Sequence, residues 1–257
     1  MNAPHIVAFG GGVDSTAMVI GLVKDKQPID LILFADTGGE RPHTYEHIKK
    51  FSEWLVEQGY PEIVTVKRVR RNGELETLEQ ECHRRKNLPS IAYGFKSCSQ
   101  KHKIAPQDKY LNSWKPAKDA WESGIKCVKY IGYDANESHR ADNAAKRNDP
   151  KYDYRYPLIE WDWDREECLD VIRSIGFENV GKSACFFCPS SKSKEIVDLY
   201  IQYPDLLQRA LDIEAQAELT SIKGLGRKFS WRDVINAHKS QMELPFGGFD
   251  LPCECTE

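Results

Sequence analysis

Residues 5–16, HIVAFGGGVDST, decide the fold of this chain. Residues 5–9 form a brief apolar run that is typical of a strand covered on both faces, and the sequence from Ser15 onward is typical of a helix. The three glycines at 10–12 permit left-handed backbone conformations and let backbone N–H groups approach a ligand closely. Asp14 and Ser15 follow at a helix N-terminus, where backbone donors are unpaired. The stretch therefore predicts a strand, a turn suited to a phosphate group, and a helix.

The turn departs from two common phosphate-binding motifs. It has neither the lysine nor the longer spacing of the Walker motif. It also fails the G-x-G-x-x-G dinucleotide fingerprint, because Asp14 and Ser15 stand where a further spacer and glycine are needed. On spacing alone, an ordinary glycine-rich turn between a strand and a helix is an equal alternative.

Composition indicates an ordinary globular chain. Its 257 residues suffice for one large α/β domain with or without a small helical appendage, and 40% of them are hydrophobic and 29% charged. No apolar run is long enough to span a bilayer, and the glycines interrupt the only early apolar stretch. We therefore expect no signal peptide, no membrane partner and a cytoplasmic location. The net charge of -3 argues against a surface devoted to nucleic acid, and we interpret the basic clusters at 67–71 and 83–86 as solvated faces.

Strands and helices alternate along most of the chain, each strand a short buried run and two of the helices ended by a glycine. After residue 192 the sequence is mostly helical, and Pro204 begins a new helix. The predicted strands are 5–9, 30–36, 63–69, 127–132 and 155–160, and the predicted helices that follow the first one are 43–58, 74–86 and 164–176.

This alternation predicts a parallel sheet with right-handed crossovers. We expect a Rossmann-like α/β three-layer sandwich with a mainly parallel five-stranded sheet and a helical C-terminal part. Residues 1–180 would form the nucleotide-binding α/β domain, and residues 181–257 a C-x-x-C segment and helical appendage packed on the same core. Ligands of such sheets bind at the carboxyl ends of the strands, where residues 10–15 and 36–39 both lie.

The glycine turn resembles the PP-loop of the N-type ATP pyrophosphatases, whose usual form is S-G-G-x-D-S. A glycine replaces the leading serine here, which removes one hydroxyl group that would help to hold a phosphate. The resemblance implies that the turn binds the phosphates of an adenine nucleotide and that its last two residues take part in catalysis. The residues of the turn are Gly10, Gly11, Gly12, Val13, Asp14 and Ser15.

Residues 34–40, FADTGGE, and 42–45, PHTY, resemble the phosphoadenosine phosphosulfate reductase-like family of the same superfamily, the adenine nucleotide alpha hydrolases. In that family the end of the second strand helps to seat the adenosine. The resemblance implies this role for Asp36, Thr37 and Gly38. A capped turn, in which the aspartate only binds nearby backbone donors, is the alternative.

Residues 132–140, GYDANESHR, resemble a further segment of this family that contains a glutamate, a serine and an arginine, to which Glu137, Ser138 and Arg140 correspond. The resemblance implies that the first two contact the nucleotide and that the arginine is catalytic. Asp134 stands where an arginine is common in the family. The loss of that positive charge argues against a substrate with an additional phosphate or sulfate group.

Residues 96–106, KSCSQKHKIAP, are similar to the C-T-x-x-x-K-x-x-P segment of the same relatives. The resemblance implies that Lys101 and Lys103 face phosphate oxygens. It also implies that Cys98 handles sulfur or binds a metal. A surface helix with a half-buried thiol is the alternative.

The chain has eight cysteines, which in a reducing compartment are better explained by metal binding, redox chemistry or burial than by disulfides. Cys185 and Cys188 form a C-x-x-C turn, which places two thiolates in one coordination sphere, as in zinc and iron–sulfur sites. In sulfur-transfer relatives, including those of DNA phosphorothioation, a cysteine at the position of Cys98 joins such a pair around a [4Fe–4S] cluster. The resemblance implies this cluster here, with zinc, a redox pair or a structural turn as alternatives.

The fourth ligand of such a cluster is not fixed by the sequence, and the position could be left open for substrate. We interpret Cys82, Cys127 and Cys168 as core thiols, although each is a candidate, because they lie on apolar helical faces or on a buried strand. Cys253 and Cys255 are candidates too. They weakly resemble the E-C-G-[IL]-H terminus that carries the nucleophilic cysteine of sulfonucleotide reductases, but the glycine and histidine are missing.

Our leading hypothesis is a PP-loop enzyme that binds ATP with Mg²⁺, adenylylates an acceptor, releases pyrophosphate and takes part in sulfur transfer. The acceptor is open between a nucleic acid, a sulfur-carrying protein and other molecules, and so is the oligomeric state. One alternative is a reductase of adenylyl sulfate (APS) or its 3′-phosphate (PAPS). An alternative of another class is a nucleotide-binding or Fe–S accessory protein of a phage, plasmid or defence system, without turnover. The catalytic residues implied by the resemblance are Asp14, Ser15, Cys98, Lys101, Lys103 and Arg140.

Overall fold

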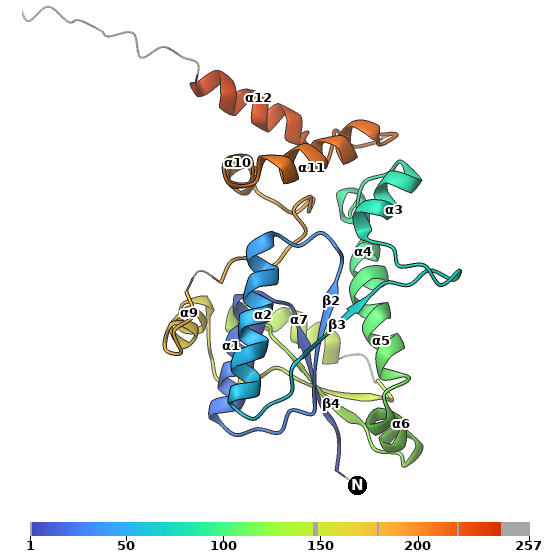
Figure 1. Cartoon of the computed structure of the whole chain (residues 1–257), viewed down its shortest axis with the longest axis vertical. Helices are drawn as coiled ribbons and strands as arrows, with labels where there is room; N and C mark the ends of the chain where they lie inside the picture. Colours follow the sequence, from blue (N-terminus) through green and yellow to red (C-terminus); the bar gives the residue numbers. More distant parts are fainter. Residues whose placement is uncertain (1, 146–148, 179, 220, 243–257) are drawn as a thin grey trace, which may run out of the picture.

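The computed structural model describes residues 2–145, 149–178, 180–219 and 221–242. Its centre is a five-stranded sheet in the order β3-β2-β1-β4-β5, in which every neighbouring pair is parallel (Figure 1). The chain runs from the central β1 outward to β3 on one side and then from β4 to β5 on the other. The strands are β1 (His5–Phe9), β2 (Leu31–Asp36), β3 (Ile63–Lys67), β4 (Cys127–Ile131) and β5 (Tyr152–Arg155).

Side chains alternate between the two faces of the sheet, so each central strand contributes to two hydrophobic cores. Val7 and Phe34 face the first core, whereas Ile6 and Leu33 face the second, and all four are buried. Because both faces are covered, these strands are continuous apolar runs in the sequence. This is the pattern from which the first strand is predicted.

Helices cover both faces of the sheet. Three helices bury their apolar residues in the first core: α1 (Val13–Lys24), α2 (Pro42–Glu57) and α9 (Arg165–Arg173). Two cover the other face: α5 (Ala105–Leu111) and α6 (Lys115–Glu122). This arrangement confirms the Rossmann-like α/β three-layer fold. No helix in the described ranges is long and apolar enough to cross a membrane.

A third hydrophobic core holds the helical part of the chain together. Phe186 and Phe187 of the C-x-x-C turn are fully buried in it. Helix α3, which precedes β4 in the sequence, packs with the C-terminal helices and lies at the same end of the molecule (Figure 1). The predicted domain division at residue 180 stays a prediction. The elements of this core are α3 (Leu78–Arg85), the 3₁₀ turn η1 (Ser90–Tyr93), α10 (Ser193–Gln202), α11 (Pro204–Gln216) and α12 (Trp231–Met242).

The prediction of a strand at 155–160 is wrong. The fifth strand lies earlier and ends at Arg155, and Pro157 begins a short helix, α8 (Pro157–Glu160). Proline has no N–H group for a strand ladder, whereas its fixed φ suits the first turn of a helix.

The helix predicted over 74–86 is too long. Val69 and Leu75 pair as an antiparallel bridge, so the chain first makes a short hairpin. The helix begins only after Thr77, whose hydroxyl group accepts a hydrogen bond from the N–H group of Gln80 at 3.1 Å. This capping box fixes the start of α3.

We predict that Phe51→Ala on α2 lowers the free energy of unfolding by about 3–5 kcal/mol. Phe51 is fully buried and stacks on Phe9 and Trp54, with ring centroids 5.6 and 5.3 Å away, so its removal leaves a cavity in the first core. Val56→Ala on the same helix is the control, because Val56 is 56% exposed and should change stability by less than about 0.5 kcal/mol. Urea unfolding measures both, and equal effects would contradict the described packing.

Candidate functional site

The strand order creates one crevice at the edge of the sheet. β1 and β4 are neighbours, with Ala8 opposite Ile131, but the chain leaves them toward opposite sides of the sheet. Such a switch point opens a crevice beyond the carboxyl ends of the two strands, where ligands of open α/β sheets bind. The glycine turn 10–12 follows β1 at this place, and Gly132 follows β4.

Close backbone packing brings these two loops together. A Cβ atom at Gly132 would lie 3.0 Å from the N and Cα atoms of Ser15, so a glycine is needed for β4 to approach the start of α1. Gly11 has a φ of +74°, and a Cβ atom there would lie 3.1 Å from Cδ1 of Ile48 on α2. The glycine turn is therefore fixed between α1, α2 and the end of β4.

Helix α1 begins with backbone donors that no side chain caps. Its N-cap residue is Gly12, which has no side chain to accept their hydrogen bonds. The hydroxyl groups of Ser15 and Thr16 donate to the carbonyl oxygen of Gly12, at 3.2 and 2.9 Å. Unpaired N–H groups at the positive end of a helix dipole favour an anion such as a phosphate group.

Asp14 lies in the first turn of α1 beside a positive charge. Its carboxylate is 3.5 Å from the guanidinium group of Arg165, the first residue of α9. Burial raises the pKa of Asp14, Arg165 lowers it, and the neighbouring carboxylates of Asp134 and Glu137 raise it. Arg165 carries no sequence signal of a functional role, because only the packing of α9 on α1 brings it to the turn.

Arg140, which was predicted to be catalytic, lies on α7 (Ser138–Ala145). Its guanidinium group is 4.1 Å from the ring centroid of Tyr133 and 2.5 Å from the carboxylate of Glu137. Tyr133 follows Gly132, which packs on the start of α1, so Arg140 lies beside the crevice, and its charge lowers the pKa of Asp14. Ser138 begins the helix and is exposed. Two arginines, one predicted and one not, thus flank the crevice.

Ser183 reaches the glycine turn from a distant segment. Its hydroxyl group lies within hydrogen-bond distance of the carbonyl oxygen of Gly10 and is 3.1 Å from the carboxylate of Glu40. Its own Cβ is 3.4 Å from the place of a Cβ atom at Gly12. No sequence pattern points to Ser183, because 173 residues separate it from the turn. A hydroxyl group therefore stands beside the turn in which glycine replaces the serine of the PP-loop.

Asp36, Thr37 and Gly38 form a closely bonded turn at the end of β2. The carboxylate of Asp36 accepts hydrogen bonds from the N–H group of Gly38 at 2.7 Å and from the hydroxyl group of Tyr45 at 2.8 Å. The hydroxyl oxygen of Thr37 lies 3.1 Å from Sγ of Cys185. These polar groups bind partners within the protein, and their part in seating an adenosine stays a prediction.

Lys101 and Lys103 have different surroundings. Both lie in the π-helical turn η2 (Gln100–Ile104), where residues two apart point to different sides. Nζ of Lys103 is 3.6 Å from the buried carboxylate of Glu40; burial lowers the pKa of Lys103, but this carboxylate raises it overall. Lys101 pairs instead with Glu81 at 3.0 Å. Their predicted role at phosphate oxygens stays a prediction.

The C-x-x-C turn packs against the same edge of the sheet. The N–H group of Cys188 donates to the carbonyl oxygen of Cys185 at 2.9 Å. Burial raises the pKa of Cys185 to about 12, and the carboxylate of Glu40 raises it as well. Burial also raises the pKa of Cys188, and the nearby Cys98 raises it by a smaller amount. The free thiols thus stand protonated in a setting that disfavours thiolates.

The predicted metal centre is not assembled in the structure. Among the residues that the structure describes, no group of three or more histidine, cysteine, aspartate or glutamate side chains is placed to hold a metal ion. The centre predicted at Cys98, Cys185 and Cys188 stays a prediction of the resemblance, and no reaction step is assigned to it. The burial expected of three further thiols is confirmed, while the tail pair at 253 and 255 lies outside the described residues. The three buried thiols are Cys82, Cys127 and Cys168.

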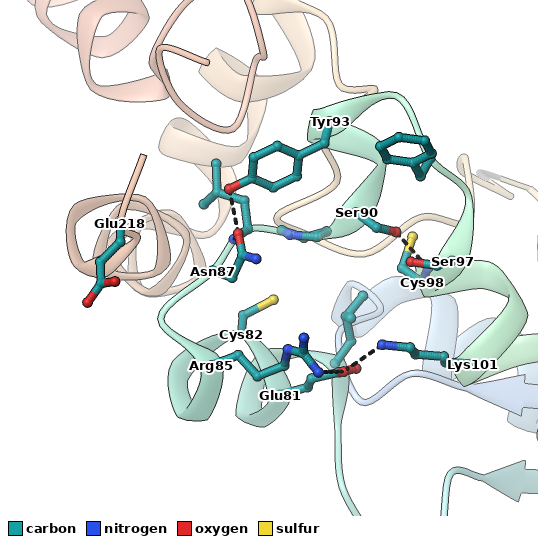
Figure 2. Close-up of a pocket in the computed structure, with 14 residues that line it drawn as sticks. Glu81, Cys82, Arg85, Asn87, Ser90, Tyr93, Ser97, Cys98, Lys101 and Glu218 are labelled. Carbon is teal, nitrogen blue, oxygen red and sulfur yellow. Dashed lines mark hydrogen bonds and ion pairs between the residues drawn. The ribbon is translucent and has the colours of Figure 1, made fainter. Parts of the chain in front are cut away.

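A cavity of about 370 Å³ lies beside this edge of the sheet, lined by residues of α3, η1 and α4 (Ser97–Ser99) (Figure 2). Leu78 lines the cavity and also donates its N–H group to the carbonyl oxygen of Thr37 at 2.9 Å, so the cavity adjoins the end of β2. Cys82 and Cys98 both line it. No sequence pattern points to this cavity, because its walls come from separate segments that share no motif.

Comparison with known proteins identifies the family. Residues 4–170 match the family model described as phosphoadenosine phosphosulfate reductase domain. Because the match covers more than half of the chain, the chain belongs to this family. No curated protein matches the chain. The family assignment supports an enzyme with a nucleotide-related role in sulfur metabolism.

We predict that the free energy of unfolding falls as the pH is lowered from 6.5 toward 4, because of His47. This residue lies on α2 and contacts Thr16 of α1. Its Nε2 lies 2.9 Å from the hydroxyl oxygen of Thr16, and burial lowers the pKa of His47 from 6.5 to about 4. Between these values the unfolded chain binds a proton that the folded chain does not, so protonation favours unfolding by about 1–2 kcal/mol after allowance for partial exposure.

The control for this prediction is His139→Gln, since His139 is exposed on α7. In His47→Gln this part of the pH dependence should disappear, whereas His139→Gln should keep it. Urea unfolding at a series of pH values measures the difference. An unchanged pH profile in His47→Gln would show that His47 is not the group responsible.

Proposed function

We propose that this chain binds ATP with Mg²⁺ and transfers the adenylyl group to an acceptor, releasing pyrophosphate, in a reaction of sulfur transfer. One observation carries the proposal: the uncapped N-terminus of α1, the glycine turn and two arginines converge at the switch point between β1 and β4. The family assignment supports a nucleotide substrate and sulfur metabolism. The choice of ATP and of adenylyl transfer rests on the PP-loop pattern.

The chemistry of this transfer depends on positioning and on neutralising charge. Backbone N–H groups of residues 10–15 would hold the β- and γ-phosphates at the end of the helix dipole. Arg140 and Arg165 would neutralise charge at the α-phosphorus, where the acceptor attacks and pyrophosphate leaves. Both guanidinium groups lie beside carboxylates, Glu137 and Asp14, that could release them when phosphates bind. Mg²⁺ enters with the nucleotide and neutralises part of its charge.

The hydroxyl group of Ser183 can replace the serine that the glycine turn lacks at residue 10, which favours catalysis by this turn. The family pattern places a serine where this chain has Gly10, and the hydroxyl group of Ser183 lies against the carbonyl oxygen of that same residue. We assign to Ser183 the phosphate contact that the missing serine would make. Its second partner, Glu40, accepts a hydrogen bond from the same hydroxyl group when the loop is empty.

A groove of about 540 Å³ between α2 and β3 is the place that we assign to the adenosine. Its wall includes Asp36 at the end of β2 and Tyr45 and Ile48 of α2. Ile48 also packs against the glycine turn, since a Cβ atom at Gly11 would lie 3.1 Å from it. The groove therefore begins where the phosphate turn ends.

We predict that Ser183→Ala lowers the rate of pyrophosphate release at least about tenfold and that Gly10→Ser restores it in the same protein. A side chain fits at residue 10, because its Cβ atom would be 3.5 Å from the hydroxyl oxygen of Ser15, an ordinary contact. The measurement is pyrophosphate released from ATP–Mg²⁺ with a panel of nucleic acid and sulfur-carrier acceptors.

Ser193→Ala is the matched control, since Ser193 is an exposed serine at the start of α10, close by in the sequence, and should leave the rate unchanged. If the wild-type chain releases no pyrophosphate with any acceptor, the adenylyl transfer proposal fails. If it turns over but Ser183→Ala is fully active, only the role of Ser183 is wrong.

A second candidate is a sulfonucleotide reductase, which the description of the matched family favours. It predicts release of sulfite from APS or PAPS with a tail cysteine as nucleophile. Cys255→Ser should then abolish sulfite release, and a Cys255→Ser protein with full activity would exclude this mechanism. An accessory protein without turnover would bind adenine nucleotide but yield neither product.

The [4Fe–4S] or zinc centre is tested by the metal content and visible absorption of protein purified without oxygen. Cys188→Ser should remove metal bound at the predicted centre, whereas Cys127→Ser, in the core of the sheet, should retain it. A metal-free chain that still binds nucleotide would separate the nucleotide site from the predicted centre.

A further inference from the structure

The cavity beside α3 combines two thiols with charges of both signs. Figure 2 shows Cys82 on α3 and Cys98 on α4 at different walls of the cavity. Cys82 is 3% exposed and Cys98 is half-buried, and both are free thiols. The cavity volume of about 370 Å³ is in the range of sites for small organic molecules. The adenylyl transfer proposed above uses none of these groups.

One wall of the cavity carries two cations, Arg85 and Lys101, around the single carboxylate of Glu81, and we call it the positive wall. Glu81 is 7% exposed and lies at its centre. Lys101 approaches it at 3.0 Å and Arg85 at 3.8 Å, and both cations are partly exposed. Burial alone would raise the pKa of Glu81, but hydrogen bonds from His102 and Lys101 and the charge of Arg68 lower it overall. The shared carboxylate therefore stays ionised and leaves a net positive charge that suits a ligand carboxylate.

The negative charge of the cavity comes from a different segment. Glu218 follows α11, and its N–H group donates to the carbonyl oxygen of Lys86 at 3.0 Å, just after α3. Its exposed carboxylate lies on the other side of the cavity from Lys101 in Figure 2. This arrangement suits a ligand ammonium group. A zwitterion with a sulfur atom complements both charged walls and the thiols.

We propose that this cavity binds a low-molecular-weight persulfide of the amino-acid type and presents its outer sulfur to Cys98. Its carboxylate lies toward Arg85 and Lys101, and its ammonium group lies toward Glu218. The binding site stands on the cavity alone, whereas its role as the entry of sulfur rests on the sulfur transfer proposed above. Cys98 is the receiving thiol because it is the more exposed of the two.

The transfer balances without an oxidant or reductant. The thiolate of Cys98 attacks the outer sulfur of the persulfide R–S–SH, a new S–S bond forms at Cys98, and the S–S bond of the donor breaks. The electron pair of that bond leaves with R–S⁻, which takes up the proton lost from Cys98. The products are Cys98–S–SH and R–SH.

The test uses disulfides as charge-graded probes on the full chain. Each transfers half of itself to Cys98 and releases the other half as a thiolate. The probes are cystine, whose halves are zwitterions, cystamine, which is cationic, dithiodiglycolate, which is anionic, and neutral 2-hydroxyethyl disulfide. Peptide mass spectrometry follows the label on Cys98, and rates are normalised to those with free glutathione. We expect cystine to react at least about tenfold faster than the neutral probe.

Variants test whether the faster labelling by cystine depends on the cations of the positive wall and on the carboxylate of Glu218. Arg85→Met combined with Lys101→Met should remove the advantage of cystine over cystamine, and Glu218→Gln should remove its advantage over dithiodiglycolate. Lys118→Met and Glu122→Gln, both exposed on α6, are matched controls that should keep both preferences. With cysteine persulfide, Cys98 should gain one sulfur atom in the wild-type chain and much less in the double variant.

Equal normalised rates for all four probes would overturn the proposal, and so would a Cys98 that is unreactive because a metal holds it. Labelling needs no ATP, so the result is independent of pyrophosphate release. A charge preference without pyrophosphate release would leave the binding site standing and overturn only adenylyl transfer. Pyrophosphate release together with equal labelling rates for the four probes would overturn the binding site and leave adenylyl transfer standing.

Discussion

The close contact between Gly132 and the backbone of Ser15 is the constraint on which the candidate site depends. It joins the end of β4 to the first turn of α1 across the switch point of the sheet. Without a side chain at residue 132, the two loops lie close enough for the uncapped end of α1 and the segment of Arg140 to border one crevice. The site is therefore a property of backbone packing first and of side chains second.

The C-terminal segment completes this edge of the sheet. Ser183 contacts the glycine turn, and Cys185 contacts Thr37 at the end of β2. The N–H group of Phe186 donates to the carbonyl oxygen of Gly39 at 2.7 Å, and its ring is buried in the helical core. One short segment thus joins the sheet to the helical part and places thiols beside the crevice. The proposed nucleotide site and the cysteines proposed for sulfur chemistry therefore lie at the same edge of the sheet.

Local features could be predicted from the sequence, and features made by distant segments could not. The strand-turn-helix at residues 5–16 and the helix predicted from residue 164 depend on neighbours in the chain. The structure confirms both, with Asp164 as the N-cap of α9. The basic clusters at 67–71 and 83–86 were interpreted as solvated faces, but several of their arginines pair with the buried carboxylates of Glu76 and Glu81. Such pairs, like the cavity with its two thiols, arise only when separate segments fold together.

The most direct test of the central claim is calorimetric titration of the full chain with ATP–Mg²⁺, comparing wild type with Gly132→Ala. A methyl group at residue 132 must displace the start of α1, so we predict at least about tenfold weaker binding. Gly124→Ala is the control, because its φ of +73° also strains an alanine but its surroundings are open. Equal affinity in wild type and in a folded Gly132→Ala protein would contradict a phosphate site at this crevice.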